Sequence, residues 1–195
     1  MMIEAQCIPA KPTIFPVKVS LEKLNISKRK RKRKQENRKK EISLKLMGNN
    51  VNSLVQKLPA LEHLLSVEKP SAIFLQETRL GRPGRIKTPS TTKYTWYELH
   101  RTINAKKGGK GGGIAIGVLN SLDPSFISEG DDEIEALTVE IWLDGFPVRL
   151  ICGYGPQEYD SKERKNGFWD YLNKEVQNAS AGGAGVILQM DGKGI

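Results

Sequence analysis

Five polar residues of this chain stand where apolar segments end, which is where side chains can be held together to do chemistry. They are Asn50 and Asn52 after the first such segment, then Glu77, Tyr154 and Asp191 after three later ones. Taken singly, a carboxylate that follows a strand is more often a helix cap or a solvated loop residue. All five in this order favour a shared site, because loops converge at strand ends while the strands stay rigid.

The segments that must position these residues show the periods of strands and helices. Apolar residues alternate from Ile42 to Leu46, which predicts a strand. Leucines at helical spacing predict a helix that begins at Pro59 and ends at Pro70. Asp144-Gly145 is a strong two-residue hairpin signal. The other predicted strands cover residues 71–76, 94–99, 114–119, 134–143, 146–154 and 185–190, and a second helix covers residues 160–178. Interleaved strands and helices with one hairpin predict an α/β (α+β) fold in which helices pack on a mixed sheet.

The charge of the chain is concentrated in one tract. The 195 residues carry a net charge of +9, and residues 28–40 alone contain ten basic residues and one acidic residue. The rest is neutral, so we divide the chain into an irregular N-terminal segment at residues 1–40, which includes the basic tract, and a domain at residues 41–195. A tract of this density predicts contact with nucleic acid or an importin, and a merely solvated tail is the alternative.

Several classes of protein do not fit the sequence. No apolar run approaches the length of about 18 residues that a membrane span needs, and the first residues hold no apolar core of a secretory signal. Cys7 and Cys152 are too few for a disulfide framework or a metal quartet. We therefore expect a protein of the nucleus or the cytoplasm that is not secreted and has no membrane partner. The sequence predicts no oligomeric state.

Around the five polar residues the chain resembles the endonuclease/exonuclease/phosphatase superfamily, which includes deoxyribonuclease I, exonuclease III and the abasic-site endonucleases. The segments that carry the resemblance are LKLMGNNVNSL (44–54), IFLQETRL (73–80), RLICGYGPQE (149–158) and GVILQMDGKGI (185–195). They are similar to the family's strand ending in Trp-Asn, its Leu-Gln-Glu-Thr motif, its Tyr-x-Pro motif and the start of its Gly-Asp-x-Asn motif. Within the superfamily the chain looks most like the endonuclease domain of non-LTR retrotransposons.

The resemblance implies a DNase I-like fold, of which residues 41–195 would form a partial four-layer α/β sandwich with mixed sheets. The site residues that it implies are catalytic Tyr154 and Asp191, substrate-binding Asn52 and Lys193, and metal-binding Asn50 and Glu77. Tyr154 would donate to the scissile phosphate, and Asp191 would orient or deprotonate the attacking water. The implied cofactor is Mg²⁺, with Mn²⁺ as a substitute, because a hard cation with oxygen ligands offsets the charge that builds up during phosphodiester hydrolysis.

The sequence also departs from the family pattern. Asn49 stands where the family has tryptophan, Met190 where it has the glycine before the aspartate, and Lys193 where it has asparagine. The family's later part, which carries an Asp-His pair, has no counterpart in residues 41–195. We therefore expect a retroelement-derived DNA endonuclease domain that is truncated and inactive, which leaves open whether the chain is an enzyme. The alternative is a non-catalytic nuclear protein that binds nucleic acid through a basic arm.

DNA is the partner that both interpretations share, bound by the basic tract and by the rim of the site. About six phosphate contacts from residues 28–40 would give a slope of log K against log salt of roughly −5 on duplex DNA. Deleting residues 28–40 is expected to remove most of the binding and to flatten that slope, as measured by fluorescence anisotropy across a salt series. A deletion variant that keeps the slope would place the DNA contact on the folded domain.

Overall fold

The structure, a computed structural model, describes residues 2–5, 13–20, 41–81, 86–100, 112–131 and 133–191. The basic tract at residues 28–40, Cys7 and Lys193 lie outside this part, so the predictions about them stay predictions. The helices are α1 (Leu58–Glu68) and α2 (Lys162–Ala181), with 3-10 turns at Val55–Lys57, Ser90–Lys93 and Asn120–Leu122. The strands are β1 (Met2–Ala5), β2 (Thr13–Ser20), β3 (Glu41–Asn50), β4 (Ala72–Gln76), β5 (Tyr94–Leu99), β6 (Ile114–Leu119), β7 (Ser125–Glu129), β8 (Ala136–Leu143), β9 (Phe146–Tyr154) and β10 (Gly185–Asp191).

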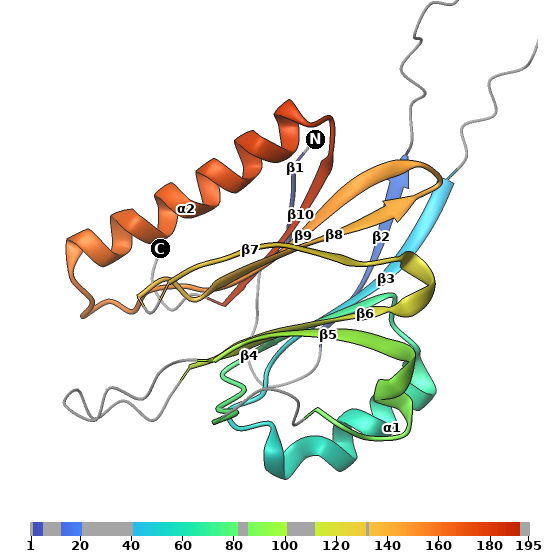
Figure 1. Cartoon of the computed structure of the whole chain (residues 1–195). Helices are drawn as coiled ribbons and strands as arrows, with labels where there is room; N and C mark the ends of the chain where they lie inside the picture. Colours follow the sequence, from blue (N-terminus) through green and yellow to red (C-terminus); the bar gives the residue numbers. More distant parts are fainter. Residues whose placement is uncertain are drawn as a thin grey trace, which may run out of the picture.

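The strands form two mixed sheets that face each other, with one helix on each outer side (Figure 1). One sheet has the order β2-β3-β4-β6-β5, and the other has the order β1-β10-β9-β8-β7. Helix α1 covers the first sheet and α2 covers the second, which gives four layers. The α/β sandwich with mixed sheets and a DNase I-like arrangement, predicted from the sequence, is confirmed.

The core between the sheets is built from every second residue of the central strands. Leu44, Phe74 and Ile116 of one sheet pack in one cluster with Val139 and Leu150 of the other, and none of them is more than 2% exposed. Because successive side chains of a strand point to opposite faces, the alternating pattern turns one apolar row of each strand into this space. The apolar rows thereby fix how the two sheets lie against each other.

Each helix buries one apolar face on its sheet. Helix α1 has Pro59 in its first turn, as predicted, and packs Leu61 and Leu65 against the outer face of β3, β4 and β6. Helix α2 packs Phe168 and Leu172 on the outer face of β8, β9 and β10. Residues spaced by four lie on one side of a helix, so both pairs form a continuous contact. No helix in the described part of the chain is long and apolar enough to cross a membrane.

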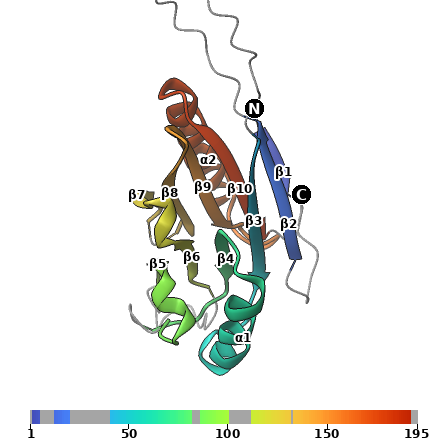
Figure 2. The same ribbon diagram turned by 90° about the vertical axis from the view of Figure 1, so that its right-hand side faces the viewer.

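Residues 1–40 are not irregular throughout, which corrects the prediction. β1 pairs in parallel with β10, and β2 pairs antiparallel with β3 along its whole length. Both are edge strands (Figure 2), and an edge tolerates Pro16 because only one side of the strand needs its N–H groups for a ladder. The third strand that the sequence did not predict, Ser125–Glu129, is also an edge strand. The residues of β7 are exposed or half-buried throughout, so its sequence lacks the apolar alternation of the central strands.

Removing a side chain from the core between the sheets is expected to destabilise the fold strongly. Leu150→Ala leaves a cavity at a position that is 0% exposed and contacts both sheets, so the free energy of unfolding should fall by about 2–5 kcal/mol. The matched control is Val67→Ala on α1, where the side chain is 59% exposed and the change should stay within about 0.5 kcal/mol. Urea unfolding measures both, and equal midpoints would contradict the assigned packing.

Candidate active site

Polar residues stand at the ends of four strands, β3, β4, β9 and β10, all at the same end of the sandwich. β3 and β4 run in parallel, and their register places Asn50 beside Gln76, the residue before Glu77. β9 and β10 also run in parallel, and their register places Tyr154 beside Asp191. The carboxyl ends of both parallel pairs therefore bring two residues from each sheet to one rim.

Hydrogen bonds join these four residues across the seam between the sheets. The Glu77 Oε1 atom accepts from Asn50 Nδ2 at 2.8 Å and from the Tyr154 hydroxyl at 2.9 Å. Asn50 Nδ2 also donates to Asp191 Oδ2 at 2.5 Å. The other Glu77 oxygen, Oε2, accepts from Arg79 Nη2 at 3.2 Å. The cluster therefore places two carboxylates around a single amide, with a phenol and a guanidinium beside them.

The structure places the remaining predicted residues differently. Asn52 is exposed, and its backbone N–H donates to Asn50 Oδ1 at 3.2 Å, so it supports Asn50 through the main chain. Lys193 lies outside the described residues. Arg79 is a member of the cluster that the sequence analysis did not single out, although it follows Glu77 by two residues in the motif that was used.

The backbone at the site adopts conformations that side chains usually avoid. Glu77 has a φ of 51° and Asn52 a φ of 42°, both in the left-handed region. The segments after β3 and β4 continue their pairing there, because Val51 N–H donates to the Gln76 carbonyl at 2.9 Å and Ser53 N–H to the Glu77 carbonyl at 2.8 Å. These main-chain bonds hold the two turns together and offset the cost of the left-handed residues.

The two sheets approach each other closely just below the site. A side chain at Gly48 would place its first carbon 2.7 Å from the end of the Gln189 side chain, so Gln189 occupies the space that the glycine leaves open. Gln189 is 3% exposed and precedes Asp191 by two residues on the same inward row. Gln76 is also buried, and its amide donates to Cys152 Sγ at 3.7 Å. Because every second residue of a strand faces the same side, the alternation along β4 and β10 could have placed Gln76 and Gln189 between the sheets. Neither was predicted from the sequence.

The hydrogen bonds set the protonation states of Glu77 and Tyr154. Burial acts to raise the pKa of Glu77, but the hydrogen bonds from Asn50, Tyr154 and Arg79 outweigh it and hold that pKa below its ordinary value. The pKa of Tyr154 is raised far above its ordinary value, first by burial and then by its hydrogen bond to Glu77 and the negative charge around it. Glu77 is therefore ionised at neutral pH, and Tyr154 keeps its proton.

The donors of the cluster suit a hard divalent cation. Glu77 and Asp191 offer carboxylate oxygens, and Asn50 offers its amide oxygen Oδ1, while its Nδ2 donates to both carboxylates. Mg²⁺ prefers a few oxygen ligands while keeping several waters. Within the described ranges there is no group of three or more His, Cys, Asp and Glu residues that could hold a metal. A closed site of the kind that Zn²⁺ takes in proteins therefore does not fit the described residues, whereas an open Mg²⁺ site with few protein ligands does.

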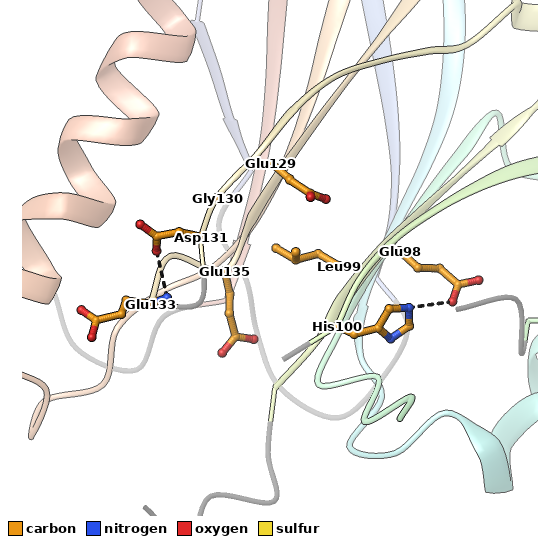
Figure 3. Close-up of a pocket in the computed structure, with 8 residues that line it drawn as sticks. All are labelled: Glu98, Leu99, His100, Glu129, Gly130, Asp131, Glu133 and Glu135. Carbon is orange, nitrogen blue, oxygen red and sulfur yellow. Dashed lines mark hydrogen bonds and ion pairs between the residues drawn. The ribbon is translucent and has the colours of Figure 1, made fainter. Parts of the chain in front are cut away.

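A hollow of about 690 Å³ lies between the end of β5 and the segment that joins β7 to β8 (Figure 3). It adjoins the cluster, because the carbonyl of its lining residue Glu135 accepts from Tyr154 N–H at 2.8 Å. Its lining includes five carboxylates, from Glu98, Glu129, Asp131, Glu133 and Glu135. Like charges at this density repel a phosphate group. The cluster around Glu77 also has the Tyr154 hydroxyl and the Arg79 guanidinium as donors, so it is the better candidate for phosphodiester chemistry.

The fold and the position of the cluster define a DNase I-like α/β sandwich, and solved structures of this kind are similar to it. The 3'-5' exonuclease NExo of Neisseria meningitidis matches with a TM-score of 0.54 and 21% identity, over 75% of this chain and 56% of that protein. TDP2 of C. elegans matches with a TM-score of 0.54 and 18% identity, over 76% of this chain and 47% of that protein. The human Nocturnin catalytic domain matches with a TM-score of 0.54 and 14% identity, over 75% of this chain and 63% of that domain.

These similarities establish the fold of the described residues. This chain spans less than two thirds of the length of each of the three neighbours. No family model matches the sequence, and no curated protein sequence matches it. Activity and substrate therefore follow from the site as proposals.

Removing the Tyr154 hydroxyl is expected to raise the pKa of Glu77. A lowered carboxyl pKa stabilises the fold at pH above the ordinary value of 4.5, and this stabilisation is lost as the pH falls through the lowered pKa. Tyr154→Phe should therefore cost about 1 kcal/mol at pH 7, and much less below pH 4. Carboxyl NMR titration gives the pKa, and urea unfolding at both pH values gives the stability.

The matched control is Tyr97→Phe, because the Tyr97 hydroxyl donates to the Pro124 carbonyl and not to a carboxylate. This variant should leave the pKa of Glu77 unchanged. An unchanged pKa in Tyr154→Phe as well would contradict the hydrogen bond across the seam.

Proposed function

We propose that residues 41–195 form part of a Mg²⁺-dependent phosphodiester hydrolase domain of the endonuclease/exonuclease/phosphatase superfamily, with DNA as its substrate. The observation that carries the proposal is the hydrogen-bonded cluster of Asn50, Glu77, Tyr154 and Asp191 at the seam of a DNase I-like sandwich. Two neighbours support DNA as the ligand: Neisseria NExo was solved with a product DNA hairpin, and D. rerio TDP2 with a single-strand DNA product.

The residues of the cluster have distinct parts in the proposed reaction. Glu77 and Asn50 would hold Mg²⁺, which supplies positive charge at the phosphate when it is bound. Tyr154 keeps its proton and does not act as a base; its hydroxyl, which donates to Glu77 Oε1 in this structure, would turn from Glu77 to donate to a phosphate oxygen. Asp191, held through Oδ2 by Asn50, orients an attacking water or accepts its proton.

The finer parts of the proposal rest on the sequence. The order of the motifs supports a retroelement endonuclease as the origin, with Asn52 and Lys193 contacting the DNA strand. The basic tract at residues 28–40 supports a nuclear location and a second contact with DNA.

We also propose that the 195-residue chain hydrolyses DNA slowly or not at all. Among the described residues, neither histidine joins the cluster: His63 is exposed on α1, and His100 contacts the Leu80 carbonyl and Glu98. The guanidinium of Arg79 is held by Glu77. A phosphate site that lacks a proton donor for the leaving group loses about 10² to 10⁴ in rate.

Removing the Glu77 charge is expected to weaken metal binding by about tenfold or more, because the one carboxylate that the proposal assigns to the metal becomes a neutral amide. Glu77→Gln is compared with the unmodified chain by Mn²⁺ binding, followed by electron paramagnetic resonance. The matched control is Glu129→Gln, which removes an exposed carboxylate from the acidic hollow and should leave Mn²⁺ affinity unchanged. Equal affinity in all three proteins would contradict the metal site and favour the non-catalytic interpretation.

The same preparations are assayed for nicking of supercoiled plasmid with Mg²⁺, where none is expected. Nicking that disappears in Glu77→Gln would support the hydrolase and overturn the proposed low activity. Nicking that survives this substitution would assign the cleavage to another site or to a contaminant.

A further inference from the structure

We propose that Tyr159 is a stacking platform for an unpaired base of a nucleic-acid strand whose phosphate reaches Tyr154. This inference rests on the proposed function and extends it by naming a residue that selects the form of the substrate. The Tyr159 side chain is 87% exposed, which is more than any other large apolar side chain among the described residues. Single exposed apolar residues are common on proteins, so exposure alone does not assign a role.

The loop that presents Tyr159 is fixed on both sides of the ring. Asp160 N–H donates to the Gln157 carbonyl at 3.0 Å, and Gln157 N–H donates back to Asp160 Oδ2 at 2.6 Å. Arg164 Nη1 donates to Asp160 Oδ1 at 2.7 Å, and Lys165 Nζ donates to the Glu158 carbonyl at 2.6 Å. A rigid aromatic side chain binds with little loss of entropy, so this loop is suited to hold a flat ligand.

The same loop is attached directly to the proposed active site. It begins immediately after Tyr154, and its Gly155 N–H donates to the Asp191 carbonyl at 2.8 Å. The five residues from Tyr154 to Tyr159 can span at most about 18 Å. Since one strand of a duplex rises about 3.4 Å per nucleotide, the Cα atoms of the two residues lie within about the length of five nucleotides.

The exposed ring and one exposed lysine favour a nucleic-acid strand as the occupant. The loop leads into the N-terminus of α2, a helix of 20 residues whose dipole attracts negative charge. Glu158, Asp160 and Glu163 balance the basic residues of this segment, Arg164 and Lys165 are engaged within the loop, and Lys162 is exposed and could contact a phosphate. The bases of an intact duplex are already stacked on both faces, so an exposed ring can stack only on an unpaired base at an end, a nick or a loop.

The test is binding of the full 195-residue chain to single-stranded oligonucleotides that carry 2-aminopurine, without Mg²⁺ and at about 0.2 M salt to limit the contribution of the basic tract. Tyr159→Ala is expected to weaken binding roughly five- to 100-fold and to remove the quenching of 2-aminopurine. Tyr159→Trp should retain both. Duplex DNA of the same sequence should bind Tyr159→Ala and the unmodified chain equally.

The matched control is Trp142→Ala, since Trp142 is also aromatic and 49% exposed but lies at the end of β8 away from Tyr154. This variant should bind as the unmodified chain does. Replacing single bases by abasic sites should identify one position at which Tyr159→Ala causes no further loss, as expected when the ring and that base interact.

Unchanged affinity and quenching in Tyr159→Ala, equal losses in the two alanine variants, or no binding by the unmodified chain would each overturn the inference. The proposed function is judged separately by Mn²⁺ binding at Glu77. A chain that loses the Tyr159 effect but binds Mn²⁺ keeps the proposed function, and one that stacks a base without binding Mn²⁺ keeps only this inference.

Discussion

The carboxylate of Glu77 joins the two sheets at the polar end of the sandwich, and the arrangement of the site depends on it. Its Oε1 atom accepts a hydrogen bond from Asn50 in its own sheet and one from Tyr154 in the other sheet. A carboxylate that is shielded from water is costly unless donors replace the water, so both sheets must bring their donors to it. Those donors stand at strand ends, and the apolar rows behind them fix the strands. The site therefore depends on the packing of Leu44, Leu150 and their neighbours between the sheets.

The change from an apolar core to a polar site takes place within the rows of single strands. In β3 the inward row runs from Leu44 and Leu46 through Gly48 to Asn50, and in β10 it ends with Gln189 and Asp191. Gly48 leaves room for Gln189, so the sheets can stay close where their side chains become polar. Close sheets shorten the distance that Asn50 and Tyr154 must cross. Polar groups placed deeper would lack such partners, which explains why the cluster lies at the end of the sandwich.

The sequence predicted the parts of the fold that bury the most apolar surface. The central strands, both helices and the Asp144-Gly145 turn follow from period and turn chemistry, and this turn has positive φ at both residues. β7 was missed because its residues are exposed or half-buried and show no apolar alternation, and β1 and β2 were missed because residues 1–22 show no sustained period. The edge strand β5 was predicted, so an edge position alone does not hide a strand. Asn50, Glu77, Tyr154 and Asp191 could be placed at strand ends, but their contacts across the seam depend on how two sheets pack, which no local pattern encodes. Arg79 was missed because a charged residue in a loop carries no period.

The balance of charge at the cluster argues for a cation as part of the proposed site. Glu77 and Asp191 bring two negative charges, and Arg79 brings one positive charge that Glu77 already engages. A phosphodiester is itself an anion, so the described residues alone would repel the group that the reaction must bind. The basic tract could raise the local concentration of DNA, but its charge is not part of the cluster. A divalent cation held by Glu77 and Asn50 would reverse the sign of the field at the phosphate, and Tyr154, which keeps its proton, would add a hydrogen bond without adding charge once its hydroxyl turned from Glu77. The arrangement is thus suited to phosphate chemistry only with the metal, and for that reason binding of the metal is a more direct measure of this site than turnover.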